Sequence, residues 1–260
     1  MGSNPTPSAC SRGGGPPLEL SPKSKGGCRL RRLGASRRGA FGAPAAGEVT
    51  RVARVSYAAA TRDLVARDPV LAALVERAGP IRMRARNADG PFGALVRAIV
   101  FQQLAGAAAT AIHGRVRALV TGPLTPQALL AVPDADLRGA GLSANKLAAI
   151  RDLCIKVADG TVVLEHVGRL SDEDIIERLV TVRGIGRWTA EMLLIFELRR
   201  LDVWPVDDLG VRKGYAFTYG LPAMPPPREL GALGDAFRPY RSVAALYCWQ
   251  AVHLARGDAA

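Results

Sequence analysis

Two adjacent carboxylates, Asp207 and Asp208, follow a proline-containing loop in the stretch WPVDDLGVRKG. A helical pattern, LGVRKGYAF, begins directly after them, so one of the two is expected to cap that helix. A carboxylate beside a developing positive charge stabilises that charge, and it can also orient or deprotonate an attacking water. The pair therefore predicts one helix cap and one carboxylate available for a hydrolytic reaction.

A second candidate site lies upstream, in VRGIGRWTAE, where Gly184 and Gly186 flank Ile185. The glycines permit a tight turn between two helices while Ile185 fills the gap between them. Free amides at the start of the second helix, with Arg183 and Arg187 beside them, would bind a phosphate without reading a base. A plain turn after a helix end is the alternative. A nucleotide-binding loop is disfavoured, because GxGxxG lacks its third glycine, no strand precedes it and no P-loop Lys follows.

The composition is that of a globular chain with a polyanionic partner. The 260 residues are 48% hydrophobic, enough for one large domain or two small ones, and carry a formal charge of +12. Residues 1–46 carry +7 of this charge, which leaves +5 for the remainder. The longest apolar runs, ALLAV and MLLIF, fall short of the roughly 20 residues of a membrane helix, so no membrane association is expected.

Residues 1–46 are rich in Gly, Pro, Ser and Arg and have no apolar periodicity, which predicts a disordered basic arm. Three interpretations stay open: a dispensable tail, an arm that grips DNA, or an organelle transit peptide, although no amphipathic helix is evident.

Cysteine and histidine spacing argues against a structural metal. The four cysteines are far apart and form no zinc or iron–sulfur motif, which also favours a reducing, intracellular compartment. The three histidines are isolated from one another and are expected to be surface or packing residues.

From residue 52 onward the apolar residues follow a helical period, which predicts an all-α fold. Helices are expected to start behind Asp68, Thr125, Ser143 and Ser171, the last with a capping-box pattern. Gln102 and Gln103 interrupt the apolar pattern between residues 92 and 120, so a pair of helices is predicted there.

Five segments together carry a family resemblance. TVRGIGRWTAEMLLIF resembles the helix-hairpin-helix motif of the HhH-GPD base-excision DNA glycosylases, and WPVDDLGVRK matches their loop with the catalytic Asp. FQQLAGAAATAI, GLSANKLAAIRDLC and FRPYRSVAALYCW also occur in the order found in the 3-methyladenine DNA glycosylase II branch. The resemblance runs from about Tyr57 to His253. It implies two helical lobes within residues 47–260, one of about 90–200 and one of about 47–89 plus 201–260, with the active-site cleft between them. Some members have an additional β-rich N-terminal domain, for which too few residues precede the helical region here.

The resemblance assigns the catalytic role to Asp208 and leaves Asp207 as the expected cap or loop residue. Trp188 occupies the place where relatives that also cut the DNA backbone carry a Schiff-base lysine. A monofunctional enzyme that leaves an abasic site is therefore implied. Lys213 is expected to contact phosphate or solvent instead.

A base must leave the duplex to reach such a carboxylate. By resemblance, Gln103 is the wedge inserted into the DNA, and Gln102 contacts DNA or caps a helix; an ordinary turn between helices is the alternative. Trp188 and Trp249 match aromatic residues of the base pocket, where cation–π stacking favours cationic alkylated purines. Core packing is the alternative for Trp188. Met192 stands where some members have a pocket tyrosine, and Trp204 and Tyr240 are weaker pocket candidates.

The implied function is excision of alkylated bases, 3-methyladenine and related lesions, from double-stranded DNA in base excision repair. The resemblance implies a monomer that requires no cofactor, contains no iron–sulfur cluster and holds no metal by its side chains, with a monovalent cation at the hairpin carbonyls as an option. The compartment would be the bacterial cytoplasm and nucleoid, or a eukaryotic nucleus. The alternatives are a glycosylase for another lesion class and a catalytically silent protein that binds damaged DNA.

Overall fold

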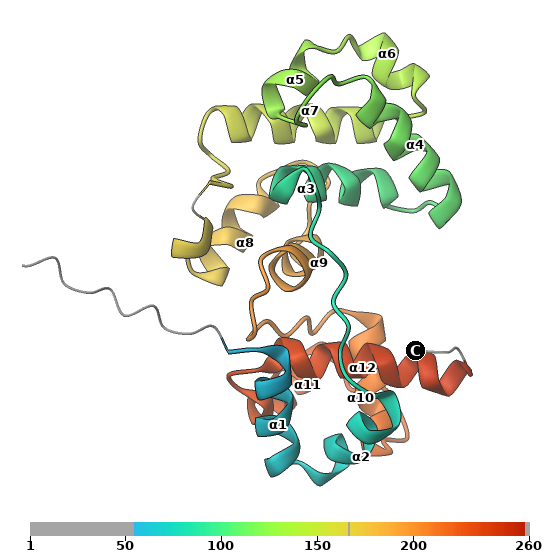
Figure 1. Cartoon of the computed structure of the whole chain (residues 1–260), viewed down its shortest axis with the longest axis vertical. Helices are drawn as coiled ribbons and strands as arrows, with labels where there is room; N and C mark the ends of the chain where they lie inside the picture. The colour runs from blue at the N-terminus through green and yellow to red at the C-terminus, as the bar shows by residue number, and fades with distance from the viewer. Residues whose placement is uncertain (1–54, 166, 258–260) are drawn as a thin grey trace, which may run out of the picture. The chain divides into compact units, whose positions relative to one another are not determined.

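The computed structural model describes residues 55–165 and 167–257, and this part of the chain contains helices and no strand (Figure 1). The all-α prediction is thus confirmed, whereas the predicted arm, residues 1–46, lies outside the described residues. The α-helices are α1 Tyr57–Arg67, α2 Pro69–Ala78, α3 Gly90–Phe101, α4 Gly106–Ala118, α5 Pro126–Ala131, α6 Asp134–Gly139, α7 Ala144–Ala158, α8 Asp172–Val180, α9 Arg187–Met192, α10 Leu209–Tyr219, α11 Pro227–Leu233 and α12 Arg241–Arg256. Short 3-10 turns are η1 Val167–Arg169 and η3 Gly234–Phe237, and a π-helical turn, η2 Leu193–Glu197, extends α9.

The predicted helix starts are confirmed by side-chain caps. Asp68, Thr125 and Ser143 each accept a hydrogen bond from the backbone amide three residues later, at 2.9, 3.1 and 3.3 Å. Ser171 and Asp174 form a reciprocal capping box at the start of α8. Each cap satisfies an amide that the helix itself leaves without a partner.

The helices enclose two clusters of buried side chains. The first core is formed mainly by α3 to α9 and η2, and its fully buried members include Ile99, Leu129, Ile150 and Leu194. The second core is formed by α1, α2 and α10 to α12 around Leu64, Val211, Leu230 and Tyr247. Three half-buried side chains, Tyr57, Ile81 and Trp249, pack against both cores.

Two connections join the cores. The segment 79–89 leads from α2 to α3, and the segment 198–208 leads from η2 back to α10 (Figure 1). The backbone N–H of Asn87, on the first connection, donates to a carboxylate oxygen of the buried Glu197 at 3.0 Å. The first connection is thereby tied to the π-helical turn. None of the described helices is long and apolar enough to cross a bilayer.

Candidate active site and DNA-binding hairpin

Asp208 is the residue that caps α10. Its Oδ1 accepts a hydrogen bond from the Val211 amide at 2.8 Å, whereas Asp207 is exposed and caps nothing. Asp207 was expected to be the cap or a loop residue; the capping role was wrong, and Asp207 is an exposed residue of the loop. Because α10 begins at Leu209, Asp208 is the residue directly before the helix, and its side chain lies within reach of the Val211 amide.

Two tryptophans complete the surroundings of the Asp208 carboxylate. Trp249 donates its indole N–H to Oδ1 at 2.8 Å, and Trp188 donates its indole N–H to Oδ2 at 2.6 Å. Asp208 is 8% exposed, and among the described residues no Lys or Arg forms an ion pair with it. The carboxylate is thus oriented by three neutral N–H donors, so its charge is not offset by a bonded cation.

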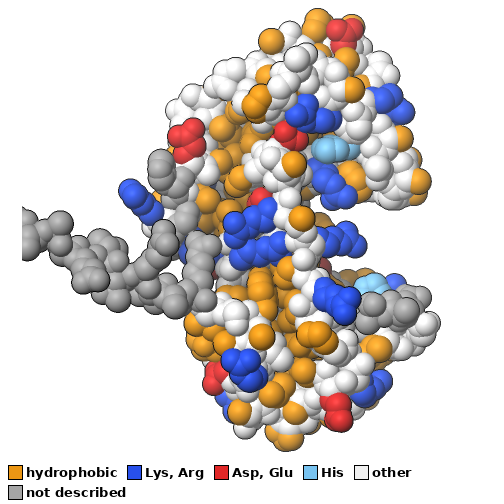
Figure 2. Space-filling model, in the orientation of Figure 1, with side chains coloured by type: hydrophobic (Ala, Val, Ile, Leu, Met, Phe, Trp, Pro, Cys, Tyr) orange, Lys and Arg blue, Asp and Glu red, His pale blue; other side chains and the backbone are white. Residues whose placement is uncertain are grey.

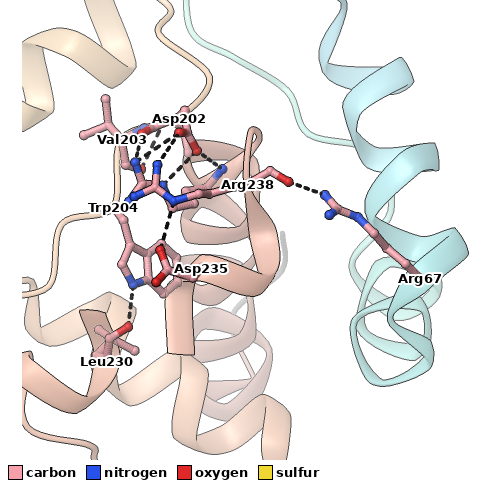
Figure 3. A network of polar contacts seen from close by, with 9 residues as sticks. Arg67, Asp202, Val203, Trp204, Leu230, Asp235 and Arg238 are labelled. Carbon is pink, nitrogen blue, oxygen red and sulfur yellow. Dashed lines mark hydrogen bonds and ion pairs between the residues drawn. The ribbon is translucent and has the colours of Figure 1, made fainter. Parts of the chain in front are cut away.

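The loop before Asp208 is fixed by a network of polar contacts (Figure 3). Asp202 accepts hydrogen bonds from Nε and Nη2 of Arg241, at 2.8 and 3.0 Å, and pairs with Arg238 at 3.1 Å. Trp204, 6% exposed, donates its indole N–H to the carbonyl of Leu230 at 2.8 Å and packs in the second core. Trp204 is thereby a packing residue, and its weaker candidacy for the base pocket was wrong.

Close packing of α10 on α12 brings Trp249 to Asp208. A Cβ built at Gly214 would lie 1.9 Å from the carbonyl oxygen of Cys248, and one built at Gly210 would lie 2.6 Å from the Trp249 ring. Only glycine permits this approach of the two helices. The indole N–H of Trp249 reaches the start of α10 because both positions lack a side chain.

The hairpin between α8 and α9 has the predicted geometry. Gly184 has a φ of +76°, in the left-handed region that favours glycine, and Ile185 is 4% exposed in the first core. The exposed amides of Gly184 and Gly186 donate to no other described residue. These amides remain available at the start of α9.

The charge at the hairpin is smaller than its two arginines suggest. Arg187 forms a bidentate pair with Glu173, at 2.8 and 2.9 Å, and contacts Glu191 at 3.2 Å. Arg183 is exposed and forms no ion pair within the described chain; its only side-chain hydrogen bond is with Asn145, at 3.4 Å. Arg183 is therefore the free cation of the hairpin, and Arg187 is largely neutralised.

Glu191 is a buried carboxyl group on α9 that sequence reasoning missed. It is 4% exposed, and burial raises its pKa to about 7 against the opposing effect of Arg187, with Asp207 adding to the increase. Its partner Arg187 lies four residues away on the same helix, but the sequence pattern does not show that Glu191 is buried or that Glu173 and Asp207 lie near it.

The turn between α3 and α4 lies against the hairpin. Gln102 is the C-cap residue of α3, and its side-chain amide donates to the carbonyl of Gly184 at 2.8 Å. Gln103 beside it is exposed and has a φ of +54°, which is unusual for a residue other than glycine. The structure thus places Gln103 next to the hairpin, in a strained conformation typical of functional positions.

A cavity of about 730 Å³ has Trp249 among its lining residues, whereas Asp208 does not line it. Its walls come from α3, α9, η2, α12 and the connection 81–87, and they include Met192, Phe196 and Trp249. Phe196 stacks on Trp249 with ring centroids 5.4 Å apart, and its side chain is 40% exposed. Sequence reasoning missed Phe196, although its spacing of four residues from Met192 and eight from Trp188 is a detectable helical signal.

Trp188 and Tyr240 were the other aromatic candidates for the base pocket. Neither residue belongs to the lining of the cavity. Trp188 is 48% exposed, so its core-packing alternative was wrong. Lys213 lies with its amine 5.3 Å from the ring centroid of Phe217, on the helix that Asp208 caps.

Several known proteins are similar to this chain in sequence and in fold. DNA-3-methyladenine glycosylase 1 of Schizosaccharomyces pombe is 37% identical over 175 residues, which are 66% of this chain and 77% of that protein. The crystal structure of a DNA-3-methyladenine glycosidase from Bacillus halodurans superposes with a TM-score of 0.70 at 38% identity, covering 77% of this chain and 93% of that one. The S. pombe 3-methyladenine DNA glycosylase in complex with abasic DNA gives a TM-score of 0.65 at 35% identity, covering 73% and 94%. The model of the HhH-GPD superfamily of base excision DNA repair proteins matches residues 96–238, and this chain belongs to that superfamily.

Proposed function

We propose that this protein is a monofunctional DNA glycosylase, which hydrolyses the N-glycosidic bond of alkylated bases such as 3-methyladenine in double-stranded DNA and leaves an abasic site. The observation that carries the proposal is the Asp208 carboxylate, oriented by Trp188, Trp249 and the Val211 amide. The names of the relatives support the same activity.

Bond cleavage builds positive charge on the deoxyribose, and Asp208 supplies a negative charge that is already oriented before the reaction. Because three N–H donors fix the carboxylate, little reorganisation is needed when the charge develops. The same carboxylate accepts a proton from, or orients, the water that attacks the sugar. The proton leaves the water, the water oxygen bonds to the sugar carbon, and the base departs with the bonding electrons.

A flipped nucleotide would pass between the hairpin and the Asp208 loop. In the proposed pose, Gln103 fills the space left in the duplex, the hairpin amides hold a backbone phosphate, and the base enters the cavity lined by Met192, Phe196 and Trp249. Aromatic faces favour an electron-poor, cationic ring over a normal base.

Strand cleavage through a Schiff base would require an amine beside the reacting sugar. The side chain that donates to Asp208 from α9 is an indole, Trp188, which forms no imine. We therefore propose hydrolysis alone, without a cofactor. The hairpin carbonyls of Val182 and Gly184 each accept one hydrogen bond and retain a lone pair, which suits a monovalent cation.

The test is base release from methylated duplex DNA by the wild-type chain and by Asp208→Asn. Asparagine is also a good N-cap, so the variant should fold, and its melting temperature checks this. The expected result is release of free 3-methyladenine that falls about 100-fold or more in the variant. Strand breaks should appear only after alkali treatment.

Two outcomes would count against the proposal. Equal release by both proteins would remove Asp208 from the chemistry, and strand breaks without alkali, trapped by borohydride, would reveal an amine nucleophile. Binding to abasic duplex without release of any alkylated base would favour a different lesion class or a silent damage-binding protein.

A further inference from the structure

The unpaired positive charge beside the cavity lies on the connection between α2 and α3, not on the hairpin. Arg82, Arg84 and Arg86 follow one another at every second position of this segment, and all three side chains are exposed. None of them forms an ion pair with another described residue. At the hairpin, by contrast, Arg187 is paired with Glu173 and Glu191, and Arg183 donates its backbone amide to the Asp152 carboxylate at 2.7 Å.

The alternation gives the segment two different sides. Ile81 and Met83 are half-buried against the cores, while the arginines between and after them face solvent. In Figure 2, Lys and Arg side chains gather at mid-height of the visible face, where this segment crosses between α2 and α3 in Figure 1. The result is a row of guanidinium groups on an apolar support.

The row borders the cavity and is continued by α3. Arg82 and Arg84 belong to the cavity lining, as does Arg97 on α3. Arg97 is exposed and lies over the ring of Phe101, 3.8 Å from its centroid, one turn before Gln102 and Gln103. Exposed arginines therefore extend from the connection between α2 and α3 to the second half of α3, which precedes Gln103.

The segment is held in place relative to the hairpin helices. Arg199 donates a hydrogen bond to the carbonyl of Arg84, and the Asn87 amide donates to Glu197 on the π-helical turn. Arg199 and Glu197 both follow α9 in the chain, so the backbone of the arginine segment has a fixed position relative to the hairpin. Because the backbone of this segment is anchored, the conformational freedom lost when an anion binds is mainly that of the arginine side chains.

We propose that Arg82, Arg84 and Arg86, continued by Arg97, form a second contact surface for the DNA backbone, separate from the hairpin. This inference rests on the proposed function, since it assigns a further contact with the same DNA. Alternate positions of an extended chain span about 13 Å over four residue steps. One strand of B-DNA carries one phosphate per about 3.4 Å of helix axis, so a row of three guanidinium groups can contact several phosphates of the same strand.

The experiment measures the affinity for a duplex with one abasic-site analogue, by fluorescence anisotropy, between 50 and 200 mM salt. Each phosphate contact contributes about 0.9 to the slope of log Kd against log salt. The triple variant Arg82→Ala, Arg84→Ala, Arg86→Ala should lower that slope by 2 to 3 and weaken binding at least tenfold near 0.1 M salt.

A matched control removes the same charge elsewhere. Arg62, Arg77 and Arg228 on α1, α2 and α11 are exposed, form no ion pair with a described residue and do not line the cavity. Their triple alanine variant should keep the wild-type slope. The triple lysine variant at 82, 84 and 86 should retain most of the slope, because the charge remains.

Failure of this inference is distinguishable from failure of the proposed function. If the wild-type chain releases alkylated bases but the two alanine triples have equal slopes, the second surface does not exist. A lysine triple as weak as the alanine triple, with an altered melting temperature, would make the arginines structural and overturn the inference. If the wild-type chain neither binds this duplex nor releases a base, the proposed function itself is wrong.

Discussion

The hairpin and the Asp208 loop face the same proposed substrate but are built in opposite ways. The hairpin presents exposed backbone at Gly184 and Gly186, whose amides donate to no other described residue, although Ile185 between them is buried. Asp208 is buried, accepts three hydrogen bonds, and follows a loop fixed by the network around Asp202.

The difference follows from what each region must do. A phosphate grip needs unpaired amides at the surface, because an amide bonded inside the protein cannot donate to DNA. A catalytic carboxylate needs a fixed orientation, since a group that must reorganise stabilises the transition state less. The hairpin amides proposed to bind phosphate are therefore exposed, and the carboxylate proposed to take part in the chemistry is closely packed.

The largest expected effect is on the free energy of unfolding, which a glycine substitution should lower near Asp208 but not in the hairpin. Gly214→Ala puts a Cβ against the Cys248 carbonyl, 1.9 Å away, so α10 and α12 must move apart. Overpacking of this kind costs about 3 kcal/mol or more. Gly186→Ala meets nothing within 4 Å and should leave stability nearly unchanged. Urea unfolding of both variants checks the contrast, and equal losses would show that the hairpin is packed as tightly as the Asp208 helix.

The next effect concerns the donors that orient Asp208. Trp188 is the only described donor to Oδ2, whereas Oδ1 retains the Val211 amide when Trp249 is changed. A hydrogen bond to a charged group contributes about 1.5–3 kcal/mol. Trp188→Phe should therefore slow single-turnover base release about 10- to 100-fold, and Trp249→Phe should slow it less.

The affinity for an abasic duplex serves as the control for both phenylalanine variants, and it should change little. A faster reaction with Trp188→Phe would contradict this account, because it would mean that the indole N–H competes with the substrate for the carboxylate.

The residue types were predictable from the sequence, and their partners were not. The two glycines around Ile185 and the cap motifs are local signals, so the hairpin and the helix starts followed from short-range chemistry. Asp207 and Asp208 were assigned the wrong capping roles, because the choice depends on where the loop enters the helix. The neutralisation of Arg187 by Glu173, across two helices, and the stacking of Phe196 on Trp249 are long-range contacts that no local pattern encodes.

A smaller effect concerns the buried carboxyl group on the hairpin helix. The pKa of Glu191 is raised from 4.5 to about 7, so the folded state binds the proton more tightly than the unfolded state. Stability from this group is present below about pH 4.5 and is lost as the pH rises to about 7. Because solvent screens part of this effect, the free energy of unfolding should fall by an amount on the order of 1–2 kcal/mol over this pH range.

Glu191→Gln should abolish this loss, since glutamine has no proton to release. Urea unfolding of the wild-type chain and the variant at pH 5 and pH 8 checks it: the variant should gain stability relative to the wild type at the higher pH. Parallel behaviour of the two proteins across this range would show that Glu191 is not penalised by burial.

The smallest effect distinguishes the two hairpin arginines. Arg183→Ala removes a free cation and should weaken binding to an abasic duplex a few-fold, with a salt slope lower by about 1. Arg187→Ala removes a charge already paired with Glu173, so its slope should stay near the wild-type value. Glu173→Gln supplies the converse: it leaves Arg187 with Glu191 as its one remaining described carboxylate partner, so binding should tighten and the slope should steepen. If Arg187→Ala lowers the slope as much as Arg183→Ala does, Arg187 must leave Glu173 when DNA binds. Both hairpin arginines then contact the DNA backbone, although Arg187 is paired with Glu173 in the free protein.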